Sequence, residues 1–269
     1  MKLGLIGCGR MGKALAVGAI DGGAVEASNL IAYDIFPAAL ERLVKEHHIK
    51  AAGSVAEVAT SADVLVLCTK PHDAPAALRE VAGSGSSCNG LLVISIAAGL
   101  TVAALERDVG DGARLIRAMP NTPALIGRGA AAFARGSGAT DEDAETARRL
   151  LGSVGLVIEV KESLMDAVTG LSGSGPAYVY VFIDALADGG VQNGLPREQA
   201  RDLAVQTVLG AAAMVQSTGE PPAVLKDMVT SPGGTTIAGL EALEARSFRA
   251  AVIEAVNTAT ARARQLGRD

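Results

Sequence analysis

The sequence predicts a doubly wound α/β domain followed by an all-helical domain, and three observations lead to that prediction. Short β-branched runs alternate with amphipathic, alanine-rich stretches through about the first 160 residues. A glycine-rich turn joins the first of these runs to the first of these stretches. After Lys161 the strand-like runs stop and long alanine-rich stretches continue. Since 269 residues suffice for two cores, we expect domains at 1–161 and 162–269.

The first half is typical of a parallel sheet that helices cover on both faces, because its apolar strands are separated by helices. The expected strands are 3–7, 30–33, 64–68, 92–96 and 115–119. The expected helices of this half are 11–21, 38–47, 55–60 and 71–81. In the second half we expect helices at 175–189, 197–218, 222–230, 235–244 and 248–265. Prolines lie at or near several of these starts, where proline is tolerated.

Several helices of the second half carry Ala, Val, Leu and Met around much of their circumference, especially 197–218 and 248–265. A domain of about 105 residues cannot bury every such face within itself. We therefore expect a homodimer that forms through this half. The alternative is that small alanines simply tolerate exposure to water.

Composition and charge exclude several classes of protein. Hydrophobic residues make up 49% of the chain and charged residues 20%, which is typical of a globular protein and excludes a collagen or a disordered chain. The net charge is −5, and the 24 Lys and Arg residues form no basic stripe, so we expect no nucleic-acid partner. The apolar run at 91–105 is too short to span a bilayer, so we expect no membrane partner.

The cysteines and histidines indicate neither a metal site nor a nucleophilic triad. Cys8, Cys68 and Cys88 show no metal-ligand or redox spacing, which fits a reducing compartment. The N-terminus shows no secretion signal, so we expect a cytoplasmic protein. All three histidines lie in the first half, and no Ser-His-Asp, Cys-His or zinc arrangement is visible. A nicotinamide reaction whose substrate needs no strong side-chain acid suits this inventory.

The most informative motif is Gly7-Cys8-Gly9-Arg10-Met11-Gly12, between the first strand and the first helix. Its glycines permit a tight turn, a close approach of the backbone to a pyrophosphate, and close packing of helix on strand. The helix N-terminus adds unpaired N–H donors. The alternative is an ordinary glycine-rich turn, but the flanking strand and helix favour a Rossmann-like dinucleotide site that includes all six residues.

Asp34 follows the second expected strand, twenty-two residues beyond Gly12. A carboxylate there can accept hydrogen bonds from both ribose hydroxyls of NADH and repels the 2′-phosphate of NADPH. Asp34 therefore favours NADH. Alternatively, it caps the helix that starts near Pro37. NADPH remains an alternative cofactor, since the Arg10 side chain can reach a phosphate.

Further site residues are expected where other strands end, because the carboxyl ends of parallel strands border the ligand crevice. The cofactor residues expected there are Cys68, Thr69, Lys70, Pro71, Ala97 and Ala98. Lys70 either neutralises a phosphate or is simply solvated. Asn121, in Met119-Pro120-Asn121-Thr122-Pro123, is a candidate for substrate binding, with a plain structural turn as the alternative.

The second half offers one polar loop, Thr230-Ser231-Pro232-Gly233-Gly234-Thr235-Thr236, directly before an expected helix. A glycine- and hydroxyl-rich helix N-terminus can bind a carboxylate through backbone N–H groups, while a threonine hydroxyl reaches a second polar atom of the ligand. The alternative is an ordinary Ser/Thr cap. Two glycines and four hydroxyls in seven residues favour an anion site.

Taken together, these segments resemble the pyrroline-5-carboxylate reductase family across essentially the whole chain. The resemblance is strongest at two segments that are highly specific to that family. They are Gly170-Leu171-Ser172-Gly173-Ser174-Gly175-Pro176-Ala177-Tyr178 and Ser231-Pro232-Gly233-Gly234-Thr235-Thr236. It also includes Gly7–Gly12, Lys70-Pro71, Ala97-Ala98-Gly99 and the Met119–Pro123 run.

The resemblance implies an NAD(P)H-dependent reduction of 1-pyrroline-5-carboxylate to L-proline, the last step of proline biosynthesis. It also implies a homodimer or a decameric ring of dimers, built through the helical domain, with each active site shared between two chains. Carried onto matching positions, the catalytic residue is Thr236, which hydrogen-bonds the ring nitrogen. Ser231, Gly233, Gly234 and Thr235 then bind the substrate with Thr236.

Two departures from the family pattern and two rival functions remain. Asp34 replaces the usual residues near a 2′-phosphate, and Met228 stands where some relatives have an asparagine. A β-hydroxyacid dehydrogenase needs a lysine on the helix after the Gly-Ser-Gly segment, yet no lysine lies between Gly170 and Lys226. A non-catalytic dinucleotide sensor would lose the Ser231–Thr236 loop, which is intact here.

Overall fold

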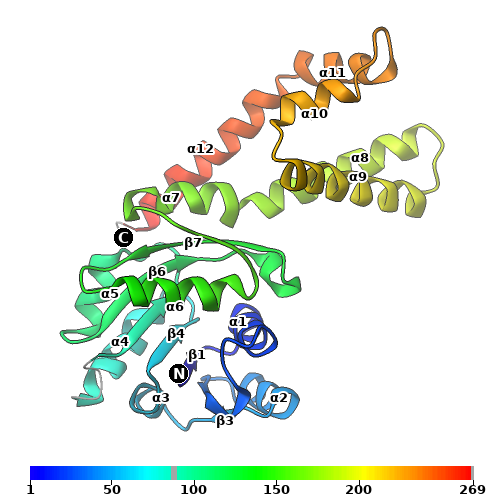
Figure 1. The fold of residues 1–269 in the computed structure, drawn as a ribbon. Helices are drawn as coiled ribbons and strands as arrows, with labels where there is room; N and C mark the ends of the chain where they lie inside the picture. The colour runs from blue at the N-terminus through cyan, green and yellow to red at the C-terminus, as the bar shows by residue number, and fades with distance from the viewer. Residues whose placement is uncertain (86–89, 268–269) are drawn as a thin grey trace. The chain divides into compact units, whose positions relative to one another are not determined.

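The computed structural model describes residues 1–85 and 90–267 and divides the chain into two compact units (Figure 1). The first unit is Met1–Ser174 together with Asn257–Asp269, and the second is Gly175–Val256. Cys88 lies outside the described residues. The division at residue 161 stays a prediction.

An eight-stranded sheet forms the centre of the first unit, with the strand order β3-β2-β1-β4-β5-β6-β7-β8. Every neighbouring pair is parallel except β6 and β7. The strands are β1 (Leu3–Ile6), β2 (Leu30–Tyr33), β3 (Lys50–Ala51), β4 (Val64–Leu67), β5 (Leu92–Ser95), β6 (Arg114–Met119), β7 (Gly129–Arg135) and β8 (Gly155–Glu159). The five predicted strands are therefore confirmed as β1, β2, β4, β5 and β6.

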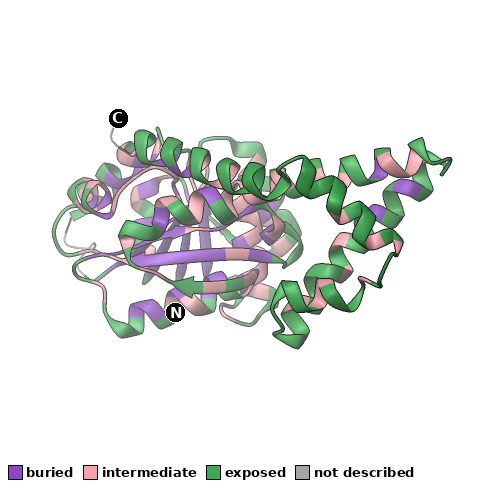
Figure 2. Ribbon diagram, turned by 90° about the horizontal axis from the view of Figure 1, so that it is seen from above, coloured by how far each residue is buried: buried purple, intermediate pink, exposed green. Residues whose placement is uncertain are grey.

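Helices cover both faces of the sheet, as the sequence predicts, and each face has its own apolar core. The helices are α1 (Arg10–Asp21), α2 (Pro37–His47), α3 (Val55–Ser61), α4 (Ala74–Gly83), α5 (Val102–Val109) and α6 (Asp141–Gly152). Alternate residues of one strand enter opposite cores: Leu92 packs with α1 and α6, and Val93 packs with α4 and α5. Figure 2 shows the buried residues concentrated along these strands.

Three strands and three helices of this unit are missing from the sequence prediction: β3, β7 and β8, and α5, α6 and the short α7 (Met165–Val168). β7 is rich in alanine, and β3 has two residues, so neither shows the β-branched run that marks a strand. Helix α6 is strongly charged and starts with a capping box between Thr140 and Asp143. The antiparallel pairing of β6 with β7 also corrects the expectation of a fully parallel sheet.

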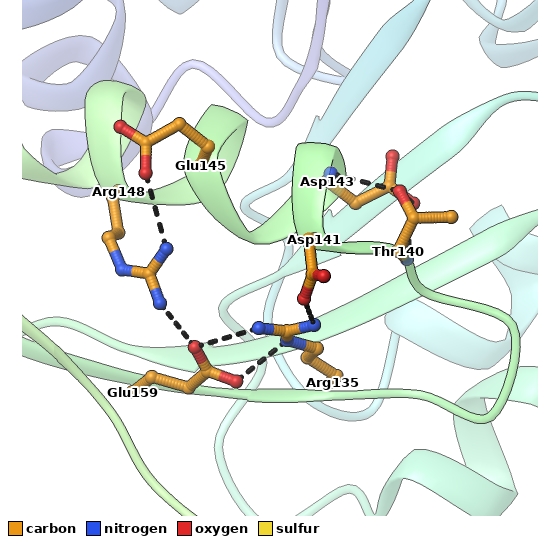
Figure 3. A network of polar contacts seen from close by, with 7 residues as sticks. All are labelled: Arg135, Thr140, Asp141, Asp143, Glu145, Arg148 and Glu159. Atoms are coloured by element: carbon orange, nitrogen blue, oxygen red, sulfur yellow. Dashed lines mark hydrogen bonds and ion pairs between the residues drawn. The ribbon is translucent and has the colours of Figure 1, made fainter.

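A polar network joins α6 to the last two strands (Figure 3). Arg135 on β7 donates to Glu159 on β8 at 3.2 Å and pairs with Asp141 at the start of α6. Arg148 on α6 pairs with the same Glu159. Because most of these groups are partly exposed, the network contributes only modestly to stability.

The second unit is helical throughout, and all five predicted helices of the second half are present. They are α8 (Gly175–Gln192), α9 (Arg197–Thr218), α10 (Pro222–Met228), α11 (Thr235–Ala245) and α12 (Phe248–Leu266), the last turns of which belong to the first unit. Large apolar side chains remain exposed on these helices, among them Val181 at 72%, Leu209 at 60% and Ile253 at 61%. Exposed apolar faces of this kind mark a surface that another molecule covers.

Candidate functional site

The glycine-rich turn has the backbone shape that a dinucleotide site requires. Gly7 has a φ of +98°, which favours glycine, and a Cβ on Gly12 would lie 1.9 Å from the Gly7 carbonyl oxygen. Gly9 precedes α1 with no side-chain cap, and a Cβ there would meet no described atom within 4 Å. The first N–H groups of α1 therefore lack intrahelical partners beside an open backbone surface.

The Asp34 carboxylate is anchored to this turn. Its Oδ2 accepts a hydrogen bond from the Cys8 N–H at 2.6 Å, and its Oδ1 accepts one from the Phe36 N–H at 2.8 Å. Helix α2 is capped by Phe36 without a side-chain hydrogen bond, so Asp34 does not serve as its N-cap. Each carboxylate oxygen retains a lone pair for a further donor.

The two cysteines at this site are poor nucleophiles. Burial, with the Asp34 carboxylate as the smaller cause, raises the pKa of Cys8 to about 12. Burial also raises the pKa of Cys68, and the neighbouring Cys8 adds to that rise. Because both thiols stay protonated near neutral pH, they serve as small packing groups in the turn.

The ends of β4 and β5 carry the remaining predicted cofactor residues. The Thr69 hydroxyl oxygen is buried and has no hydrogen-bond partner among the described residues, while Lys70 and Pro71 are exposed. Ala97 is buried and Ala98 is half-buried. Gly99 turns the chain with a φ of +80° against Leu266, at the end of α12.

Asn121 connects three segments of the first unit. The residue is buried, with 8% of its surface exposed. Its Nδ2 donates to the Ser172 carbonyl at 3.0 Å, and its Oδ1 accepts from the Ala130 N–H at 2.8 Å. Ser172 lies in a π-helical turn, Thr169–Gly173, directly before α8. Such turns are frequent at functional sites. Asn121 therefore holds the loop after β6 against β7 and this turn.

Sequence reasoning missed Arg117, which is 6% exposed on β6. Its guanidinium lies 3.2 Å from Glu162 and 3.7 Å from Asp166. Glu162 also accepts the Val102 N–H at the start of α5. The available signal was a charge in an apolar strand, because a buried arginine requires a carboxylate partner.

The predicted substrate loop lies in the second unit. Gly233 has a φ of +66°, and the Gly234 N–H donates to the Ser231 carbonyl at 3.1 Å. Gly234 is the N-cap of α11, and no side chain caps this helix. Thr235 and Thr236 occupy the first turn of α11. Thr236 is half-buried. The first-turn amides can thus receive an anion.

Two structural absences apply to the described chain. Residues 1–85 and 90–267 contain no group of three or more His, Cys, Asp or Glu side chains that could hold a metal ion. No helix in the same ranges is long and apolar enough to cross a membrane.

Comparison with known proteins decides the family. A family model described as NADP oxidoreductase, coenzyme F420-dependent, matches residues 2–99, and one described as pyrroline-5-carboxylate reductase dimerisation matches residues 162–266. The pyrroline-5-carboxylate reductase of Methanosarcina acetivorans is 43% identical over 267 residues, covering 99% of this chain and 98% of the relative. That of Arabidopsis thaliana is 45% identical, covering 98% and 95%.

The chain belongs to the pyrroline-5-carboxylate reductase family. A solved reductase structure from Coxiella burnetii matches with a TM-score of 0.93 at 34% identity, covering 98% of each chain. One from Plasmodium falciparum with NADP bound matches with a TM-score of 0.87 at 36% identity, covering 99% and 98%. Membership of this reductase family excludes the alternative that the chain is a β-hydroxyacid dehydrogenase. The match of residues 162–266 to the dimerisation model of the family supports a homo-oligomer.

Proposed function

We propose that this chain reduces 1-pyrroline-5-carboxylate to L-proline with NADH or NADPH, as the last step of proline biosynthesis. The observation that carries the proposal is the 43% identity with a pyrroline-5-carboxylate reductase over 99% of the chain. The segments that resemble that family include both the glycine-rich turn and the loop before α11.

The first unit fits a nicotinamide dinucleotide on its own geometry. Gly9 leaves an open backbone surface at the start of α1, and Thr69 holds a buried hydroxyl without a partner in the described chain. Gly7–Gly12 and the first amides of α1 hold the pyrophosphate. Cys68, Thr69, Lys70, Pro71, Ala97 and Ala98 border the remainder of the cofactor at the ends of β4 and β5.

The chemistry explains why the chain needs no catalytic histidine. When bound, the reduced nicotinamide supplies a hydride to C5 of the imine. A protonated cyclic imine is already an electrophile, so the protein has mainly to orient the substrate and stabilise charge. Thr236 is the catalytic group, because its hydroxyl hydrogen-bonds the ring nitrogen and helps retain or deliver its proton.

The loop before α11 holds the substrate carboxylate. Ser231, Gly233, Gly234 and Thr235 surround an uncapped helix N-terminus, where the N–H groups and the positive end of the helix dipole favour an anion. The sequence makes Asn121 a candidate for substrate binding. Its two intramolecular hydrogen bonds support a different proposal, in which Asn121 positions the loop after β6.

The assembly follows from the exposed apolar faces of the helical unit. We propose that two chains pair through these helices and that each active site takes residues from both chains, with a decameric ring of dimers as the larger form. Met228, at the end of α10, is 72% exposed, so it offers an apolar contact where some relatives have an asparagine. The cytoplasm is the proposed location.

The direct test mixes the purified protein with 1-pyrroline-5-carboxylate and follows the loss of NADH and NADPH absorbance in parallel. We expect substrate-dependent oxidation of at least one cofactor. Absence of turnover with both cofactors, in protein shown to be folded and oligomeric, would refute the reductase proposal. It would favour the alternative that the chain is a non-catalytic dinucleotide sensor.

A further inference from the structure

The Asp34 carboxylate occupies the position at which the two nicotinamide cofactors differ. In a doubly wound fold the adenosine ribose binds near the end of the second strand. Asp34 directly follows β2, and its bond to the Cys8 N–H ties it to the glycine-rich turn. The carboxylate is thus fixed beside the expected ribose rather than free to turn into solvent.

No cation lies on the loop that follows Asp34. Residues 35–41 contain neither lysine nor arginine, and Ile35 and Phe36 are 66% and 67% exposed. Lys13, on the adjacent helix α1, already pairs with Glu46. A 2′-phosphate at this position would therefore face a fixed negative charge and two apolar side chains.

Resting on the proposed function, we infer that this chain binds NADH in preference to NADPH and that Asp34 determines the choice. The ribose hydroxyls of NADH can donate to the lone pairs that Asp34 retains. A phosphate placed there carries nearly two negative charges. Even in water-like surroundings, two unit like charges about 4 Å apart shift an equilibrium about fivefold. We expect NADPH to bind at least about tenfold more weakly than NADH.

Arg10 does not reverse this preference. It is the first residue of α1 and directly follows Gly9, where the backbone approaches the pyrophosphate. Both cofactors carry that pyrophosphate, so a charge there strengthens both alike. The neighbouring structure from Plasmodium falciparum has NADP bound, and the inference sets this chain apart from that protein.

Calorimetric titration of NADH and NADPH into the full-length protein without substrate tests the inference apart from turnover. The expected result is the tenfold difference in Kd for the natural chain and a difference below about threefold for Asp34→Asn, mainly through tighter NADPH binding. A natural chain that binds NADPH as tightly as NADH, or more tightly, would overturn the inference. Failure to bind either cofactor would instead refute the proposed function.

Two further variants separate charge from loop geometry. Ile35→Arg leaves the Asp34 hydrogen bonds in place and adds a cation on an exposed position, so we expect NADPH binding to tighten about tenfold with NADH nearly unchanged. Arg10→Met should weaken both cofactors by similar factors. Loss of NADPH binding alone in Arg10→Met would assign the reading of the 2′-phosphate to Arg10 and contradict the role given to Asp34.

Discussion

Gly9→Ala tests whether the cofactor pyrophosphate binds at the open surface at the start of α1. Gly9 has a φ of −63° and a ψ of −173°, which alanine adopts freely, and its Cβ would meet no described atom within 4 Å. The smaller entropy of the unfolded alanine chain stabilises by about 0.4–1 kcal/mol. Alanine is a poorer N-cap than glycine, which costs a similar amount. The free energy of unfolding should therefore change by less than about 1 kcal/mol.

Cofactor binding should respond very differently, because the added methyl group fills the space where the backbone approaches the pyrophosphate. We expect the Kd for NADH to rise at least about tenfold, which corresponds to about 1.4 kcal/mol. Urea denaturation without cofactor measures the stability, and calorimetric titration measures the affinity. An unchanged Kd for NADH in the folded Gly9→Ala variant would refute the claim that the pyrophosphate binds beside Gly9.

Gly12→Ala provides the contrast to Gly9→Ala, because it should change stability as well as cofactor affinity. Its Cβ would lie 1.9 Å from the Gly7 carbonyl oxygen and 3.3 Å from the Cys68 Cβ. The backbone itself must then move, so the variant should lose about 1–3 kcal/mol or more of stability as well as cofactor affinity. A Gly12→Ala protein with natural stability would contradict the close packing of α1 against the turn.

Three other predictions concern the substrate, the loop after β6 and the pH dependence of stability. Thr236→Ala should lower kcat/KM about 10- to 100-fold with little change in the Kd for NADH, and Thr236→Ser should recover most of it; steady-state kinetics would contradict the role by showing an unchanged kcat/KM. In Asn121→Asp, only the protonated acid can donate to Ser172, so activity relative to the natural chain should rise as the pH falls toward 5; a flat ratio would remove the donor role. Desolvation by burial raises the pKa of Asp143, but the hydrogen bonds from Thr140 and Arg114 together outweigh it, so that the pKa is lowered. Its contribution is therefore complete above the ordinary aspartate pKa near 3.9 and is lost as the pH falls through the lower folded value; urea midpoints should show Asp143→Ala less stable by about 1–3 kcal/mol at pH 7, with a smaller gap below pH 4.

The sequence predicted those parts of the fold that carry strong periodic signals. β4, with four consecutive apolar residues, and α9, with its alanine-rich surface, both lie where their patterns place them. β7 escaped prediction because alanine has a low β-propensity. Its alanines pack in the apolar clusters on the faces of the sheet, Ala131 in the core beneath α1 and α6 and Ala132 with Met165, and this tertiary context overrides the propensity. Its antiparallel pairing with β6 depends on the long-range order of the sheet, which no local pattern specifies.

The site shows a similar division. The Gly7–Gly12 turn was predictable because its glycines answer a local backbone requirement. The two hydrogen bonds of Asn121 join residues 9 and 51 positions away, so their geometry emerges only from the fold. The pairing of the buried Arg117 with the partly exposed Glu162, 45 positions apart, has the same origin.

Transfer of a labelled hydride tests the central claim most directly. The protein is incubated with 1-pyrroline-5-carboxylate and NADH that carries deuterium at the transferable C4 position, and the product is examined by mass spectrometry and NMR. The account predicts one deuterium at C5 of L-proline for each NADH oxidised, with the new N–H proton drawn from water. Oxidation of NADH without deuterated proline, or no oxidation by folded protein with either cofactor, would contradict the claim that this chain is a pyrroline-5-carboxylate reductase.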